Sequence, residues 1–137
     1  MAKQQRRWVY SPKKAKKPKV SEDTKWMVII KAQAIIDNHF KPNAIREVPP
    51  DYEWNYIVDI YGKWNRNYYY LISKYHCPGP NAISPSFEAK FTRLEYAGPN
   101  SYNLAFMRHN NKWAEVMVDL TLEDALQQIE TNPYFQP

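Results

Sequence analysis

"WNYIVDIYGKWNRNYYYLISKY", residues Trp54 to Tyr75, is the stretch where the apolar pattern of the chain changes to a period of two. Successive side chains of a strand point to opposite sides, so alternate residues share a face. In the first half one face groups Trp54, Tyr56, Val58 and Ile60, and the other groups Asn55, Ile57, Asp59 and Tyr61. "WNRN" (64–67) is typical of a turn, and "YYYLISKY" continues as a second strand with apolar residues on both faces. The pattern predicts a hairpin in an antiparallel sheet.

Three more strands follow. Glu88, Lys90 and Thr92 alternate with apolar residues up to a slip near Arg93–Leu94, which predicts a bulge. "AGPNS" (97–101) and "NNK" (110–112) are turns that lead into "YNLAFMRH" and "WAEVMVDL". Short turns between successive strands predict a five-stranded antiparallel meander.

Two helices flank the strands. Ser21 is a suitable N-cap for a helix over residues 22–40 that ends before Pro42. Its predicted inward stripe consists of Trp26, Ile29, Ile30, Ile36 and Phe40, widened by Val28 and Ile35. Thr121 caps a short second helix, which ends at Asn132–Pro133 and whose apolar face is Leu122, Ala125, Leu126 and Ile129.

The order of these elements predicts an α+β fold. A basic extended arm (1–20) precedes a single domain (21–137), which has an N-terminal helix, a five-stranded antiparallel meander sheet and a short C-terminal helix. We expect the helices to pack on one face of the sheet.

The net charge of +5 hides a division between these two parts. Residues 1–20 carry eight basic side chains and no acidic one, whereas residues 21–137 carry 11 basic and 14 acidic groups, a net charge of −3. No apolar run approaches the roughly 20 residues needed to span a membrane, and the arm lacks the apolar segment of a secretory signal. A single cysteine, Cys77, excludes an internal disulfide. We therefore expect a cytoplasmic protein without a membrane partner.

The arm favours a non-enzymatic role in binding nucleic acid, RNA or a ribonucleoprotein more than DNA. Lysines spread along an extended chain neutralise phosphates and release counterions. The predicted phosphate contacts are Lys13, Lys14, Lys16, Lys17 and Lys19, with Arg6, Arg7 and Trp8 as anchors. The tyrosines Tyr68–Tyr70, Tyr56 and Tyr61 either offer bases a stacking surface or belong to the core.

Two alternatives remain open. In a protein–protein adaptor or assembly subunit, Trp8, Val9 and Tyr10 would dock in a groove of the partner.

In a metal-dependent nuclease, Asp59, Glu88 and Lys90 would bind a divalent cation and activate water. These three residues resemble the Asp…Glu-x-Lys core of a nuclease superfamily. Val58 replaces the usual preceding proline, the continuous strand order departs from that superfamily, and an exposed Glu–Lys strand face is the simpler interpretation.

Other chemistry has weaker support. His76 beside Cys77 suggests an activated thiolate, but adjacent strand residues point to opposite faces, so we favour a structural corner built around Pro78, Pro80 and Pro85. The histidines His39, His76 and His109 have no metal-ligand spacing, and there is no P-loop, dinucleotide fingerprint or Gly-x-Ser-x-Gly motif. No cofactor or metal is expected.

Three stretches, "CPGPNAISPSFEAKF" (77–91), "MRHNNKW" (107–113) and "NPYFQP" (132–137), resemble a family of small uncharacterised bacterial proteins. The resemblance implies a single compact domain in a bacterial cytosol. It carries no functional residue over to this chain.

Overall fold

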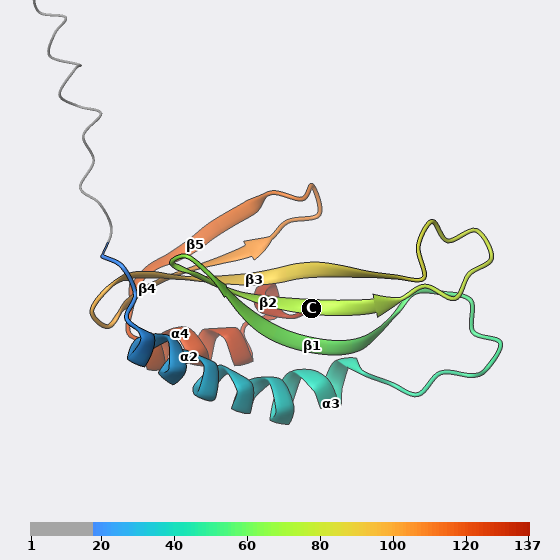
Figure 1. Ribbon diagram of the computed structural model, residues 1–137, viewed down its shortest axis with the longest axis horizontal. Helices are drawn as coiled ribbons and strands as arrows, with labels where there is room; N and C mark the ends of the chain where they lie inside the picture. Colours follow the sequence, from blue (N-terminus) through green and yellow to red (C-terminus); the bar gives the residue numbers. More distant parts are fainter. Residues whose placement is uncertain (1–17) are drawn as a thin grey trace, which may run out of the picture.

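Five antiparallel strands form one sheet, and helices cover one of its faces (Figure 1). The computed structural model describes residues 18–137. The strands are β1 (Tyr56–Asn65), β2 (Tyr68–His76), β3 (Ser86–Gly98), β4 (Ser101–Met107) and β5 (Trp113–Leu120). The helical segments are α2 (Glu22–Ile35), a π-helical turn (Ile36–Phe40), α3 (Lys41–Ala44), α4 (Leu122–Thr131) and a 3-10 turn (Pro133–Phe135). The order β1-β2-β3-β4-β5 confirms the predicted meander and the α+β class.

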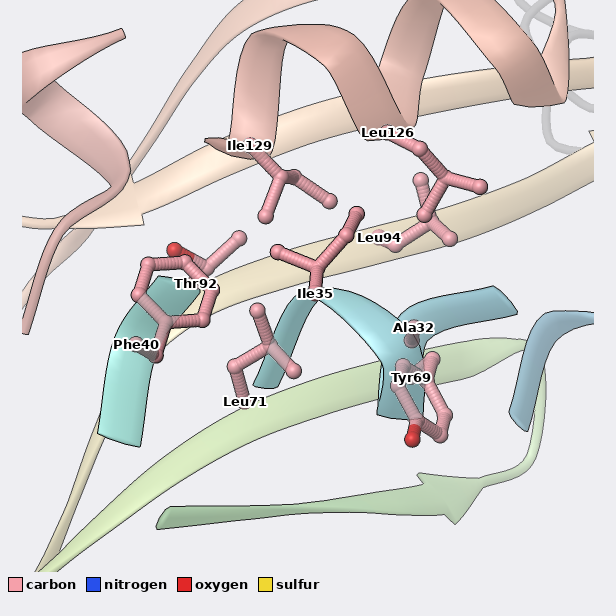
Figure 2. Close-up of a pocket in the computed structure, with 9 residues that line it drawn as sticks. All are labelled: Ala32, Ile35, Phe40, Tyr69, Leu71, Thr92, Leu94, Leu126 and Ile129. Atoms are coloured by element: carbon pink, nitrogen blue, oxygen red, sulfur yellow. The ribbon is translucent and has the colours of Figure 1, made fainter. Parts of the chain in front are cut away.

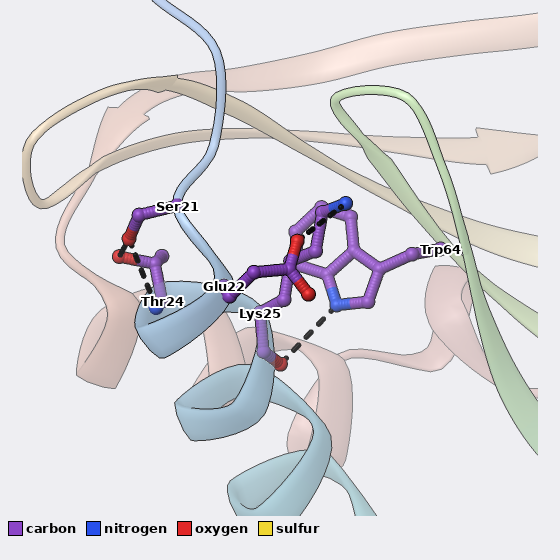
Figure 3. Close-up of polar contacts among 5 residues, drawn as sticks. All are labelled: Ser21, Glu22, Thr24, Lys25 and Trp64. Carbon is purple, nitrogen blue, oxygen red and sulfur yellow. Dashed lines mark hydrogen bonds and ion pairs between the residues drawn. The ribbon is translucent and has the colours of Figure 1, made fainter.

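Helix α2 begins where the sequence predicts. The Ser21 hydroxyl accepts a hydrogen bond from the Thr24 backbone N–H at 3.2 Å, and Glu22 pairs with Lys25 at 3.4 Å (Figure 3). The Trp64 indole N–H donates to the backbone carbonyl of Lys25 at 3.2 Å. This bond ties the first turns of the helix to β1.

The predicted end of this helix at residue 40 is wrong. The helical path continues through the π-helical turn into α3, which contains Pro42 and ends at Ala44. Within the turn, the Lys41 N–H donates to the carbonyl of Ile36, five residues back. A wider turn relieves the clash that a proline ring makes with the preceding turn of a regular helix, so the chain stays helical past Pro42.

The buried stripe of the helix is also rotated from the predicted one. It consists of Val28, Ala32, Ile36 and Phe40, spaced four residues apart. Trp26 and Ile30, predicted to face inward, are 61% and 64% exposed. The small Ala32 in the middle of the stripe lines the same space between helix and sheet as Tyr69 on β2 (Figure 2).

The space enclosed between the helices and the sheet is core, without room for a ligand. Its volume is about 10 Å³, close to the smallest that holds one water molecule. The side chains around it point toward one another, and all are apolar except for the hydroxyls of Thr92 and Tyr69: Ala32, Ile35, Phe40, Tyr69, Leu71, Thr92, Leu94, Leu126 and Ile129 (Figure 2).

Bulges change two of the predicted strand faces. The register of β1 shifts between Ile57 and Asp59, so Ile57 and Ile60 both pack against the core and Val58 is exposed. The register of β3 against β2 shifts at Phe91 rather than at Arg93–Leu94. Both Phe91 and the residue after it are buried, because a bulge places two residues opposite one.

The second helix forms as predicted. The Thr121 hydroxyl accepts a hydrogen bond from the Asp124 N–H at 3.1 Å, and the helix ends at its C-cap, Asn132. Its four predicted apolar residues are buried. Within residues 18–137, no helix has the length and apolar character needed to cross a bilayer.

Gly62 on β1 provides a test of the packing between strand and core. A Cβ at this position would lie 1.9 Å from the hydroxyl oxygen of Tyr69, whose buried ring packs against Trp64 with centroids 5.3 Å apart. We expect Gly62→Ala to lower the free energy of unfolding by roughly 1–3 kcal/mol, measured by urea denaturation, because the core must shift to accept the methyl group.

A double-mutant cycle provides the control for this prediction. In a Tyr69→Leu background the obstructing ring is absent, so Gly62→Ala should cost much less. An equal cost in both backgrounds would show that the contact with Tyr69 is not the cause.

Candidate nucleic-acid interface

The sheet face opposite α2 and α4 carries no helix among the described residues (Figure 1). We call it the open face. Strand register aligns Lys63, Tyr70, Arg93, Ala105 and Glu115 across the five strands. Directly paired residues project on the same side of a sheet, so this row lies on one face. The residues that alternate with it along the strands form the core, which places the row on the open face.

An aromatic–cationic cluster lies along the open face: Tyr68, Tyr70, Lys90, Arg93 and Trp113. The ring of Tyr70 is 6.0 Å from that of Tyr68 and 5.7 Å from that of Trp113, between centroids. The Arg93 guanidinium lies 4.7 Å from the Tyr68 ring and 5.1 Å from the Trp113 ring. The Lys90 ammonium is 4.3 Å from the Tyr70 ring. Cation–π contacts therefore fix both cations on the rings.

Some residues of the open face are buried rather than exposed to solvent. Ile72 and Ala105 belong to the open face but are only 4% and 1% exposed. The hairpin of β4 and β5 bends away from the helices (Figure 1). Among the described residues, the Arg93 Nε atom is buried without a hydrogen-bond partner, and the guanidinium contacts the two rings.

The charge of the open face is mixed. No carboxylate among the described residues lies within ion-pair distance of Lys90 or Arg93. The acidic residues on this face include Glu88, which accepts a hydrogen bond from the Tyr61 hydroxyl, and Glu95, which accepts one from the Asn103 amide at 3.2 Å. Two cations thus stay available to an anion, while two of the acids are engaged.

Tyr61 and Glu88 are electrostatically coupled on the open face. The pKa of Tyr61 is raised to about 12, first by its hydrogen bond to Glu88, then by burial and by the negative charges of Glu88 and Asp59. Ionisation of the phenol would break the hydrogen bond and place an anion beside a carboxylate.

This coupling predicts the effect of Glu88→Gln. The neutral amide should lower the pKa of Tyr61 toward its ordinary value near 10, which a difference titration of tyrosinate absorbance against the wild type measures. Because the folded-state pKa lies above the unfolded one, the pair stabilises the fold below about pH 10, and this contribution is lost as the pH rises toward 12. Superimposable titrations of the two proteins would contradict the coupling.

The arm joins the domain beside the cluster. The Asn67 side-chain amide donates to the backbone carbonyl of Pro18 at 2.9 Å, and Asn67 directly precedes Tyr68. Val20 is buried in the core, and Lys19 is exposed. The other residues predicted to bind nucleic acid or a partner lie outside the described part of the chain: Arg6, Arg7, Trp8, Val9, Tyr10, Lys13, Lys14, Lys16 and Lys17.

The residues of the nuclease hypothesis have separate partners. Asp59 pairs with Lys41 at 3.5 Å, and Lys74 on β2 stands between Asp59 and Glu88 in the strand register. Lys90 lies one row further along β3. In the part of the chain that the structure describes, no three His, Cys, Asp or Glu side chains are grouped to hold a metal ion. Catalysis by these residues stays a prediction from the sequence.

The geometry around Cys77 supports the structural corner. Its backbone N–H donates to the carbonyl of Pro85 at 2.8 Å and closes the loop, and the residue is buried. The His76 ring packs edge-on against Tyr56, with centroids 5.4 Å apart.

The sequence indicated part of this cluster. Tyr68, Tyr70 and Tyr61 lie on the open face, whereas Tyr69 is in the core. Sequence reasoning missed Trp113, because β5 is three strands away from β2 in the sheet and only the three-dimensional path of the β4–β5 hairpin brings the Trp113 ring to Tyr70. Its position at the start of an alternating strand was the available signal.

Residues 20–137 match the family model described as a domain of unknown function, DUF3024. The chain belongs to this family. The DUF3024 domain contains the whole sheet and the helices α2, α3 and α4, and nearly all of the basic arm precedes it. Comparison with curated proteins and with solved structures found no match. The predicted membership of an uncharacterised family is confirmed, and the bacterial cytosol stays a prediction.

Proposed function

We propose that the protein binds nucleic acid, RNA in preference to DNA, through its basic arm and without catalysing a reaction. The arm carries eight positive charges and no negative one, whereas the rest of the chain carries a net charge of −3. Contacts to phosphate dominate the affinity of such complexes, and the arm is the one segment of the sequence with that concentration of positive charge. The mildly acidic domain then serves to position the arm.

The main support for the proposal is the position at which the arm joins the folded domain. The hydrogen bond between Asn67 and Pro18 holds the chain next to Tyr68, at one end of the aromatic–cationic cluster. Lys13 to Lys17 lie one to five residues before Pro18, which an extended chain spans in at most about 18 Å. A nucleic-acid strand whose phosphates bind the arm therefore passes within reach of the cluster. Unpaired RNA bases are commonly recognised on aromatic side chains, which favours RNA.

Co-purification tests this proposal directly. Two full-length variants replace the five arm lysines with glutamine or with arginine: Lys13, Lys14, Lys16, Lys17 and Lys19. We expect nucleic acid to co-purify with the wild type and the arginine variant but not with the glutamine variant, because only the first two keep the charge.

The same experiment separates the adaptor hypothesis. If protein partners remain bound after nuclease treatment, a protein complex through Trp8, Val9 and Tyr10 replaces nucleic-acid binding. If nucleic acid co-purifies equally with all three proteins, the arm is not the contact. If none retains it, the proposal is wrong.

A further inference from the structure

We infer that the open face is a stacking platform for unpaired bases, so the protein prefers single-stranded to double-stranded nucleic acid. This inference rests on the proposed function and adds the folded domain as a second contact. Its stacking residues are Tyr68, Tyr70 and Trp113, and the cations Lys90 and Arg93 lie over one side of these rings.

The accessibility of the rings is the first argument. The three aromatic side chains are half-buried, and the strand register places them on the open face. Aromatic residues in the core, such as Tyr69 and Tyr102, are instead enclosed between the sheet and the helices. Neighbouring rings of the cluster are 6.0 and 5.7 Å apart between centroids, so together they offer an extended apolar surface.

The charge of this face is the second argument. A surface that bound a duplex through its phosphates would need an excess of cations. Here Lys90 and Arg93 are fixed on aromatic rings, and Glu88, Glu95 and Glu115 share their face. The face thus provides rings with local positive charge, which suits bases and a few phosphates. In a duplex the faces of the bases are stacked on one another and cannot reach such rings.

A hollow at the far end of the cluster is the third argument. It has a volume of about 380 Å³ and begins at Lys90, away from the end where the arm joins. Its lining combines apolar and hydrogen-bonding groups: Phe87, Glu88, Ala89, Lys90, Met107 and Asn111. Concave sites of this size with a few polar groups hold small organic groups. A base that is turned out of a nucleic-acid strand is a group of this kind. The contacts then run from the arm across the rings into this hollow.

The test measures binding of the full-length protein to a labelled 12-nucleotide RNA without internal pairing, alone and annealed to its complement. Tyr70→Leu and Trp113→Leu should each weaken single-strand binding by roughly 5- to 150-fold, the loss expected for one stacked base. Binding to the duplex and the salt dependence should change little, because neither residue is charged. Tyr70→Phe keeps the ring and should bind like the wild type.

A spectroscopic signal makes the test independent of folding defects. Single-stranded RNA should quench the fluorescence of the wild type more than that of Trp113→Phe, because a base stacks on the Trp113 indole. Trp26→Leu removes an exposed tryptophan on α2, away from the open face, and should leave affinity unchanged.

The outcomes distinguish the platform from the arm. The inference is wrong if the wild type binds single strand and duplex with equal affinity and if Tyr70→Leu and Trp113→Leu keep the wild-type affinity. In that case the proposed function still stands if the glutamine variant of the arm binds weakly. Failure of the wild type to bind either probe overturns both.

Discussion

Replacing Phe135 with alanine should lower the free energy of unfolding by about 3–5 kcal/mol, the cost typical of removing a buried phenylalanine. Phe135 is fully buried, and its ring meets Phe106 edge-on with centroids 6.4 Å apart. Its backbone carbonyl accepts a buried hydrogen bond from the Thr92 hydroxyl at 3.0 Å. The substitution would leave a cavity beside this bond.

The bonds of the neighbouring Gln136 increase the expected effect. Its side chain is hydrogen-bonded to the His39 ring at 2.9 Å and donates to the carbonyls of Ile129 and Asn132 at 3.0 and 3.1 Å. The segment after α4 thus links that helix to the π-helical turn, and Phe135 anchors it.

Urea denaturation of Phe135→Ala and of the matched variant Tyr134→Ala measures this effect. Tyr134 stacks on Phe106 at 5.0 Å but is 66% exposed, so its replacement should cost less than about 1.5 kcal/mol. Equal costs for the two variants would show that the tail is not anchored by the buried ring.

The second large effect concerns the arm. Replacing its five lysines with glutamine should weaken binding to unstructured single-stranded RNA roughly 10³-fold at 0.1 M salt. Each phosphate contact contributes about 0.7 to the slope of log K against log salt for single strands, so the slope should flatten by about 3.5. The affinities of the two proteins should converge near 1 M salt. A salt titration by fluorescence anisotropy measures both quantities.

The arginine variant of the arm is the control, because it preserves charge and should retain the slope. Lys31→Gln removes a cation from the exposed side of α2 and should have little effect. If the glutamine variant kept both the affinity and the slope of the wild type, the arm would make no phosphate contacts.

Local signals in the sequence were sufficient to predict the order of elements. Ser21 and Thr121 cap their helices as expected, since a capping side chain acts on the backbone two or three residues away. The strands follow their alternation and short turns. These features depend on near neighbours in the chain, so one sequence contains them.

The predictions from the sequence were wrong where contacts between distant parts of the chain decide the structure. Trp26 and Ile30 fit an apolar stripe by spacing, but contact with the sheet selects the row through Val28 and Ala32. Proline normally stops a helix, but the π-helical turn before Pro42 accommodates it. The bulge at Phe91 depends on pairing with β2.

The candidate site was also predictable from the sequence only in part. Its arm was visible as a run of charge, and Tyr68 and Tyr70 were visible as a cluster of aromatic residues. The inclusion of Trp113 and Arg93 required the register of four strands. The junction at Pro18 required a hydrogen bond to Asn67, 49 residues away.

The most direct measurement is an NMR titration of the isotope-labelled full-length protein with the unstructured 12-nucleotide RNA, following each backbone amide. The account predicts shift changes in two places: the arm up to Lys19, and the open-face residues Tyr68, Tyr70, Lys90, Arg93 and Trp113. Changes confined to the exposed face of α2 around Trp26 and Ile30, or no changes at all, would contradict it.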